Sequence, residues 1–155
     1  MKKIDKILCP VDFSEPSDAA LHAAVELAKR YSASILLVHA INELDPVPSP
    51  SYALDSHVME QIPHIMGQMT ENAHRAMRDL IDNQVESGMS VDQRVIVGEP
   101  AKSIVRLAED EQVDLIVMAT HGRSGITGLF FGSVAEKVVR SAACPVLTLR
   151  EKGKQ

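Results

Sequence analysis

The sequence predicts an α/β fold in which five parallel strands form one sheet with helices on both faces. Short apolar segments alternate along the whole chain with longer segments whose apolar residues recur at helical spacing. Residues 34–41 and 115–119 are apolar at nearly every position, which is typical of strands covered on both faces. Parallel strands joined by right-handed helical crossovers follow, and for a doubly wound sheet we expect the strand order 3-2-1-4-5.

The composition predicts a single domain spanning residues 1–155. A chain of 155 residues, 45% of them hydrophobic, is long enough for one well-formed core and too short for two ordinary domains. The formal net charge is −5, and the chain has no Trp, two Tyr and three Phe. Nucleic-acid binders use basic surfaces and aromatic stacking platforms, so we expect no nucleic-acid partner.

The sequence also predicts a cytoplasmic location with no membrane association. No apolar run approaches the roughly 20 residues of a membrane span, and the N-terminus enters a strand without the apolar stretch of a signal peptide. Cys9 and Cys144 lie in apolar contexts without a C-x-x-C spacing, which favours two buried reduced thiols over a zinc site. The histidines likewise show no metal-binding spacing, so the sequence assigns no metal ligand.

The first half of the chain is expected to contain a strand at 4–11, a helix ending near Ser32 and a strand at 34–41. Ser14 is a suitable N-cap for the helix, and Pro16 is tolerated in its first turn. The apolar stripe of this helix is predicted to be Ala20, Ala23, Ala24, Leu27 and Tyr31.

Residues 42–63 are expected to form an irregular surface excursion, because prolines at 46, 48 and 50 exclude regular structure there. A lid, a partner surface and a tolerated insertion all remain open for it. A helix over 64–86, ended by Gly88, is predicted next. Its buried stripe is predicted to be Met66, Met69, Ala73, Ala76, Met77 and Leu80, with the methionines packing in the core rather than binding a metal or peptide.

The second half is expected to begin with an edge strand at 91–97 whose Val91, Val95 and Val97 share one face. A helix opened by Gly98-Glu99-Pro100 and ending near Gln112 follows, and then a strand at 115–119. A short helix at 133–141, a strand at 144–149 and a charged tail complete the chain. The inward residues of the two helices are predicted to be Ala101, Ile104, Val105 and Ala108, and Val134, Val138 and Val139.

The candidate site lies in residues 115–133, where an apolar strand leads through a glycine-spaced polar loop into a helix start. Glycines let backbone N–H groups approach a phosphate closely, and helix N-termini supply unpaired donors. In a doubly wound sheet, ligands bind beyond the carboxyl ends of the strands where the strand order reverses. That rule brings Pro10-Val11-Asp12 beside Ala119-Thr120-His121-Gly122, so we expect a nucleotide site in this crevice.

The loop is neither a Walker A element nor a G-x-G-x-x-G fingerprint. Gly122 would let the chain turn, Arg123 could supply charged donors, and Gly132-Ser133 would present N–H groups and a hydroxyl. A carboxylate repels phosphate, so Asp12 is assigned to the base or ribose hydroxyls, with metal contact as a second choice.

Catalysis is expected to be absent or limited to slow hydrolysis of the bound nucleotide. His121 and His39 could act as acid or base, but a hydrogen-bonding or structural role is favoured because no nucleophile pattern accompanies them. Ser124 lacks the G-x-S-x-G spacing of a nucleophile elbow, and no P-loop lysine is present.

The chain resembles the universal stress protein family, in its nucleotide-binding branch, nearly from end to end. The residues that carry the resemblance are 7–14 (ILCPVDFS), 38–40 (VHA), 118–125 (MATHGRSG), 132–139 (GSVAEKVV) and 144–146 (CPV). The ATP motif of the family is glycine, two residues, glycine, nine residues, glycine and then Ser or Thr. Gly122, Gly132 and Ser133 match it, whereas Ala119 stands in place of the first glycine.

The resemblance implies a Rossmann-like fold of the adenine-nucleotide alpha hydrolase type, with ATP, together with Mg²⁺, as the ligand. By position, it implies that adenine and ribose contact Pro10, Val11, Asp12 and Ala40. The ribose and first phosphates would contact Met118, Ala119, Thr120, His121, Gly122 and Arg123, and the outer phosphates Gly132, Ser133 and Val134. It further implies a homodimer through the last strand, Val146 to Leu149.

The function expected from the resemblance is that of a small ATP-binding regulatory protein of the stress response. Ala119 in the place of a glycine favours an alternative, a dimeric interaction module of the same fold with little nucleotide affinity. An ATP-using transferase or ligase is a weaker third possibility, because fold alone does not determine chemistry.

Overall fold

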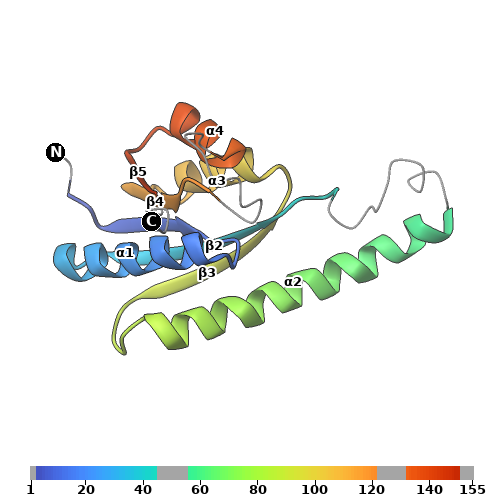
Figure 1. The fold of residues 1–155 in the computed structure, drawn as a ribbon, viewed down its shortest axis with the longest axis horizontal. Coiled ribbons are helices and arrows are strands. Elements are labelled where there is room, and N and C mark those ends of the chain that lie inside the picture. Colours follow the sequence, from blue (N-terminus) through green and yellow to red (C-terminus); the bar gives the residue numbers. More distant parts are fainter. Residues whose placement is uncertain (1–2, 45–55, 122–131, 151–155) are drawn as a thin grey trace, which may run out of the picture.

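Five parallel strands form a single sheet in the order β3-β2-β1-β4-β5, which confirms the predicted fold and strand order (Figure 1). The computed structural model describes residues 3–44, 56–121 and 132–150. The strands are β1 (Lys6–Pro10), β2 (Ser34–Ile41), β3 (Val91–Val97), β4 (Leu115–Ala119) and β5 (Val146–Leu149). The predicted bounds of β2, β3 and β4 are met to the residue. Nearly continuous apolar positions mark β2 and β4, whereas valines that share one face mark the edge strand β3.

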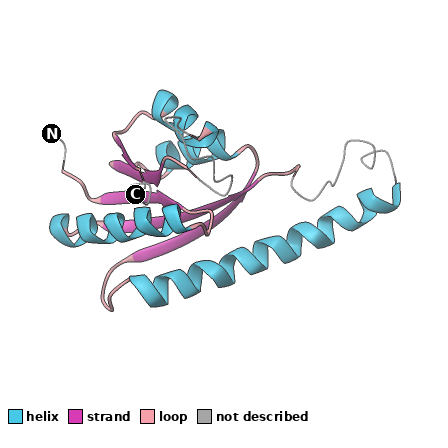
Figure 2. Cartoon of the chain, viewed as in Figure 1, coloured by secondary structure: helices cyan, strands magenta, loops and turns pink. Residues whose placement is uncertain are grey.

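Four helices cover the two faces of the sheet (Figure 2). They are α1 (Glu15–Tyr31), α2 (Ser56–Gln84), α3 (Pro100–Asp110) and α4 (Ser133–Ser141). Successive residues of β1 point to opposite faces: Ile7 and Cys9 contribute to a core with α1 and α2, whereas Leu8 contributes to a core with α3 and α4. All three side chains are fully buried, so β1 is the centre of the molecule.

The starts of α1 and α3 follow the predicted capping signals. Ser14 caps α1 by accepting the backbone N–H of Ser17, with Pro16 in the first turn. Glu99 caps α3, and its carboxylate accepts the backbone N–H of Lys102 at 2.8 Å. Each cap satisfies a donor that the first helical turn leaves unpaired, which fixes where the chain turns from strand to helix.

The predicted buried stripe of α1 is correct for Ala20 and Ala24 and wrong for the residues on one side of them. Tyr31 is 39% exposed, and Ala23 and Leu27 are only half-buried, whereas Leu21 and Val25 are buried. The contact face therefore keeps Ala20 and Ala24 but is rotated around the helix toward Leu21 and Val25. The prediction followed the alanines, but the larger Leu21 and Val25 determine which face meets the sheet.

Two other valines are exposed: Val139, which was predicted to point inward, and Val97, which was predicted to share one face of an edge strand with Val91 and Val95. Val97 at the end of β3 is 47% exposed, and Val139 in α4 is 45% exposed. Val97 is the last residue of an edge strand that pairs with β2 alone among the described strands. In α4, Val138 occupies the buried position, and the neighbouring residue on a helix points about 100° away.

Helix α2 starts earlier than predicted. It begins at Ser56 and contains Pro63, so residues 56–63 of the predicted excursion are helical, while residues 45–55 lie outside the described part. Pro63 is exposed, and water can therefore satisfy the carbonyl that proline leaves without a helical donor. The first turns of α2 lie away from the sheet (Figure 1).

The buried part of α2 is smaller than the predicted stripe. Ala73 and Met77 are buried, whereas Met66, Met69, Ala76 and Leu80 are half-buried. The helix ends at Gln84, so Gly88 does not cap it directly. Gly88 instead adopts a positive φ of 96° in the turn that leads to β3, a conformation that favours glycine. No helix in the described ranges is long and apolar enough to span a membrane.

Candidate functional site

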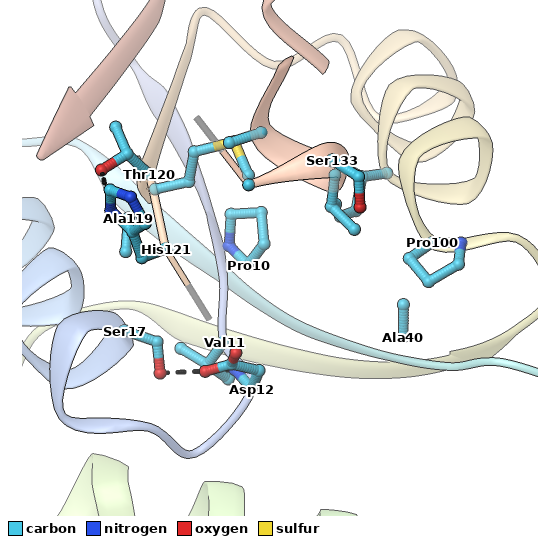
Figure 3. Close-up of a pocket in the computed structure, with 15 residues that line it drawn as sticks. Pro10, Val11, Asp12, Ser17, Ala40, Pro100, Ala119, Thr120, His121 and Ser133 are labelled. Carbon is cyan, nitrogen blue, oxygen red and sulfur yellow. Dashed lines mark hydrogen bonds between the residues drawn. The ribbon is translucent and has the colours of Figure 1, made fainter. Parts of the chain in front are cut away.

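A cavity of about 260 Å³ opens at the carboxyl ends of β1 and β4, where the strand order reverses (Figure 3). Strand β1 connects through α1 to β2 on one side, and the chain reaches β4 on the other side only after β3 and α3. The lining residues are Pro10, Val11, Asp12, Ser17, Ala40, Pro100, Ile104, Met118, Ala119, Thr120, His121, Gly132, Ser133, Val134 and Ala135.

Every predicted site residue that the structure describes lines this cavity. Gly122 and Arg123 lie outside the described residues. Residues from the first strand and from the end of the chain thus meet at one place, as the strand order requires.

Four lining residues were absent from the predicted set: Ser17, Pro100, Ile104 and Ala135. Ser17 could have been found from the sequence, because it is a polar residue on the apolar side of α1. In the structure it is 3% exposed. Pro100 was predicted only as part of a helix start and Ile104 only as an inward residue, while Ala135 had no assigned role. No local pattern indicates that these positions, near the starts of α3 and α4, also face a cavity.

The loop after β1 is held by its own hydrogen bonds. The amide of Val11 donates to the carbonyl oxygen of Val38 at 2.8 Å, which extends the β1–β2 pairing by one residue. The Oδ1 atom of Asp12 accepts from the amide of Ser14 at 3.0 Å and also from the Ser14 hydroxyl. The amide of Asp12 donates to the hydroxyl oxygen of Ser17 at 3.3 Å, as Figure 3 shows. These contacts fix the Asp12 carboxylate at the N-terminus of α1.

His39 supports this loop from β2. Its Nδ1 atom lies 2.8 Å from the carbonyl oxygen of Val11, so a proton on Nδ1 donates to that oxygen. Its ring lies against the ring of Phe13, with centroids 4.5 Å apart, and Phe13 has a φ of 63°. His39 is therefore a hydrogen-bonded, packed residue that positions the loop, in agreement with the reading favoured from the sequence.

The loop after β4 is anchored by Thr120, which is 5% exposed. Its amide donates to the carbonyl oxygen of Leu149 at 2.9 Å, and its own carbonyl oxygen accepts from the amide of Gly132 at 2.6 Å. A Cβ atom at Gly132 would lie 2.9 Å from the carbonyl oxygen of Thr120, which is closer than real Cβ atoms approach. Position 132 therefore requires glycine because of this backbone contact.

The N-terminus of α4 faces the cavity. Gly132 is its N-cap and provides no side-chain hydrogen bond, and the cavity is lined by Ser133, Val134 and Ala135 in the first turn. The N–H groups of a first turn have no intrahelical acceptor, and the helix dipole makes this end positive. The first turn of α4 can accordingly receive an anionic group.

The opposite wall of the cavity is acidic. Asp12 is the acidic residue that lines the cavity there. The negative charge is also felt by Asp18, because its pKa is raised by burial and then by the charges of Asp12 and Glu15. A ligand with hydroxyl groups or a cation at one end and an anion at the other would match this difference between the two walls. Within the described ranges, no three His, Cys, Asp or Glu side chains gather as a metal site.

The comparisons with known proteins agree with this architecture. The universal stress protein family model matches residues 3–150. The universal stress protein MJ0577 of Methanocaldococcus jannaschii is 30% identical over 154 residues, which is 95% of each chain. Its structure superposes with a TM-score of 0.85, covering 99% of this chain and 100% of that one.

Two more distant solved structures share the fold. A universal stress protein in complex with cAMP is 21% identical, with a TM-score of 0.61 and coverage of 96% of this chain and 98% of that chain. The universal stress protein from Archaeoglobus fulgidus in complex with dAMP is 22% identical, with a TM-score of 0.55 and the same coverage. The family model and the archaeal relative, each matching nearly the whole chain, show that this protein belongs to the universal stress protein family.

Proposed function

We propose that this protein binds ATP in the cavity between β1 and β4 and acts as a regulatory protein whose contacts depend on the bound nucleotide. The observation that carries the proposal is the difference between the two walls of the cavity. One wall is the uncapped N-terminus of α4, and the other holds the carboxylate of Asp12. A nucleotide has hydroxyls on its ribose and negative charge on its phosphates, and these two ends match the two walls.

The proposed orientation follows from these walls. The base and ribose lie against Pro10, Val11, Asp12 and Ala40, and the first phosphates follow the chain from Met118 to His121. The outer phosphates reach Gly132, Ser133 and Val134 at the start of α4. Pro100 and Ile104 add an apolar surface near Ala40, which suits the base.

Mg²⁺ fits this site if it binds together with the phosphates of the nucleotide. Magnesium is bound in proteins by one or two carboxylates together with substrate phosphates and water. Asp12 is the one carboxylate that lines the cavity among the described residues, so the phosphates themselves would supply the remaining charge. When bound, the ion would neutralise phosphate charge, which would reduce repulsion by Asp12.

Fold relatives lend support at the level of ligand class. Two universal stress proteins of the same fold were solved with cAMP and dAMP, both adenine mononucleotides. The choice of ATP rests on the match of Gly132-Ser133 to the family motif and on the free N-terminus of α4. Hydrolysis is expected to be slow, because no Lys or Arg lines the described part of the cavity.

The regulatory part of the proposal concerns β5. It ends the sheet within the described residues, and Leu147 on it is 41% exposed. An edge strand with exposed apolar residues favours pairing with a second copy, so we propose a homodimer through Val146 to Leu149. Cys9 and Cys144 are free thiols, which suits the reducing cytoplasm as the location.

The test is equilibrium binding of ATP with Mg²⁺ by isothermal titration calorimetry, with Ser133→Glu as the principal variant. A glutamate in the first turn of α4 favours the helix dipole, so it leaves folding intact while it repels the phosphates. Ser56→Glu, at the first residue of α2 and remote from the cavity, is the matched control. We expect Ser133→Glu alone to weaken binding by at least about tenfold. No saturable binding by the wild type below about 1 mM ATP would refute the proposal.

Ala119 favours a second candidate, an interaction module with little nucleotide affinity. Its methyl group lines the cavity where the family motif has a glycine. Native mass spectrometry of the freshly purified protein separates the two candidates. A co-purifying adenine nucleotide supports the first, and consistently empty protein together with dimerisation supports the second.

A further inference from the structure

His121 has a buried ring nitrogen without a hydrogen-bond partner among the described residues. It lines the cavity, and no residue in the described ranges bonds its Nε2 atom. A buried polar atom without a hydrogen bond costs roughly 1–3 kcal/mol, so native proteins retain such atoms rarely and usually for a reason. The ring that carries this atom belongs to a residue that lines the cavity for which a ligand is proposed above.

His121 is also distinguished by charge. It is the only residue able to carry a positive charge among those described in the cavity lining. A protonated Nε2 donates a hydrogen bond to a phosphate oxygen in either the neutral or the cationic form of the ring. The first turn of α4 and His121 would therefore both present N–H donors to an anion.

The other ring nitrogen of His121 leads away from the cavity to β5. Nδ1 lies 2.9 Å from the Oγ1 atom of Thr120, and that Oγ1 lies 3.3 Å from the carbonyl oxygen of Leu149. Leu149 is the last residue of β5, the strand at the end of the sheet. A single hydroxyl group thus stands between the cavity histidine and the edge strand.

The Thr120 hydroxyl has one proton and two possible acceptors. If the neutral ring carries its proton on Nδ1, that proton goes to Oγ1, and the hydroxyl donates to Leu149. If the ring carries its proton on Nε2, Nδ1 becomes an acceptor, and the hydroxyl donates to His121 instead. Exchange with water interconverts the two ring forms: Nδ1 releases one proton and Nε2 gains one, so the net charge is unchanged.

We propose that His121 is a phosphate-binding residue whose change of tautomer transmits occupancy of the cavity through Thr120 to the end of β5. This inference rests on the proposed nucleotide function. A phosphate oxygen on Nε2 fixes the proton there, the Thr120 hydroxyl turns to Nδ1, and Leu149 loses one of its two hydrogen bonds from Thr120. The end of the edge strand is then held less firmly when the nucleotide is bound.

The direct test is the tautomer of His121, read from its ring ¹⁵N chemical shifts with and without saturating ATP and Mg²⁺. The measurement is made at about pH 8, where histidines are ordinarily neutral. We expect ATP to convert His121 from the Nδ1–H to the Nε2–H form. Amide hydrogen exchange over residues 146–149 should become faster at the same time. An unchanged tautomer at ATP saturation would overturn the inference.

Two substitutions separate the two ring nitrogens. His121→Asn keeps a polar atom near Nδ1 and removes the one near Nε2, whereas His121→Gln does the reverse. We expect His121→Asn to weaken ATP binding by about tenfold, the effect of losing a hydrogen bond to a charged group. His121→Gln should restore part of that affinity but leave the exchange of β5 insensitive to ATP. His22→Asn, on the exposed side of α1, is the matched control.

The outcomes also separate this inference from the proposed function. If the wild type fails to bind ATP, the proposed function fails. If the wild type binds and His121→Asn binds equally well, the function stands and the role of His121 is refuted. If Thr120→Val, which lacks the hydroxyl, still shows an ATP-dependent change in the exchange of β5, the transmission through Thr120 is refuted.

Discussion

The amide of Gly132 donates a hydrogen bond to the carbonyl oxygen of Thr120 at 2.6 Å, and this contact closes the polar loop between β4 and α4. It places the first turn of α4 at the carboxyl end of the sheet, where the cavity lies. The same approach excludes a side chain, because a Cβ at Gly132 would lie 2.9 Å from that oxygen.

Replacing Gly132 with alanine is therefore expected to displace the start of α4. We expect ATP binding by Gly132→Ala to weaken by at least about tenfold, because the N–H groups of the first turn no longer converge on the phosphates. Calorimetric titration measures the affinity, and circular dichroism checks that the fold is retained. Equal affinity of the variant and the wild type would contradict this account of the loop.

Gly67→Ala is the matched control for that substitution. Gly67 lies within α2, and a Cβ there meets nothing within 4 Å. Alanine is the better helix former, so we expect Gly67→Ala to raise the free energy of unfolding by about 0.5–1 kcal/mol without changing ATP affinity. Urea denaturation followed by circular dichroism provides the measurement.

Ala119 offers a test of how closely the nucleotide approaches β4. It lines the cavity where the family motif has glycine. Removing its methyl group in Ala119→Gly should tighten ATP binding by about threefold, and enlarging it in Ala119→Val should weaken binding by about tenfold, because overpacking forces the ligand outward. The opposite order of affinities would show that the ribose does not contact this position.

The cap of α3 should make stability depend on pH. The pKa of Glu99 is lowered by the backbone N–H of Lys102 and then by Lys137, whose ammonium lies 3.1 Å from the carboxylate. A lowered pKa in the folded state means that the contribution is complete above the unfolded pKa of about 4.3 and is lost as the pH falls below it. We expect Glu99→Ala to cost about 1 kcal/mol near neutral pH, as for other N-caps, and less at low pH.

Denaturation by urea at several pH values measures that difference. The control is Glu109→Ala, at an exposed position in the same helix. The difference in free energy of unfolding between this variant and the wild type should not shrink at low pH. A penalty for Glu99→Ala that stays constant below about pH 4 would show that the carboxylate charge is not responsible.

The buried thiol of Cys9 should be inert in the folded protein. Burial raises the pKa of Cys9 from 9.0 to about 12. That shift lowers the thiolate fraction near pH 8 by about a thousandfold. In a Cys144→Ser background, labelling by a disulfide reagent should therefore proceed only at the rate of global unfolding. Rapid labelling without unfolding would contradict the burial of β1.

The dimer is tested at Leu147, which is 41% exposed on β5. A charged side chain on an edge strand disfavours pairing with another strand, so Leu147→Lys should convert a dimer into a monomer. Val139→Lys places the same charge at an exposed valine of α4, outside the strand itself, and should leave the mass unchanged. Light scattering after size exclusion gives the mass, and a Leu147→Lys protein that remains dimeric would place the interface elsewhere.

Local patterns in the sequence were sufficient for the order of elements and the parallel sheet, whereas several cavity residues, such as Ala40 and Val134, were predicted only from the family resemblance. Consecutive apolar positions such as 34–41 mark a strand that is covered on both faces, and the caps at Ser14 and Glu99 mark where helices start. These signals are local because backbone geometry and hydrogen bonding of the first turn depend on a few neighbouring residues. The strand order then determined which distant segments meet.

Only the tertiary structure decided which side of each helix is buried and how the site is held together. Leu21 rather than Tyr31 meets the sheet because the approach of α1 is set by packing against the sheet, not by its own periodicity. The contacts from Thr120 to Leu149 and Gly132 depend on the register of β4 with β5, which no local pattern encodes. The unpartnered nitrogen of His121 is likewise a property of its surroundings, because a hydrogen bond requires two groups brought together by the fold.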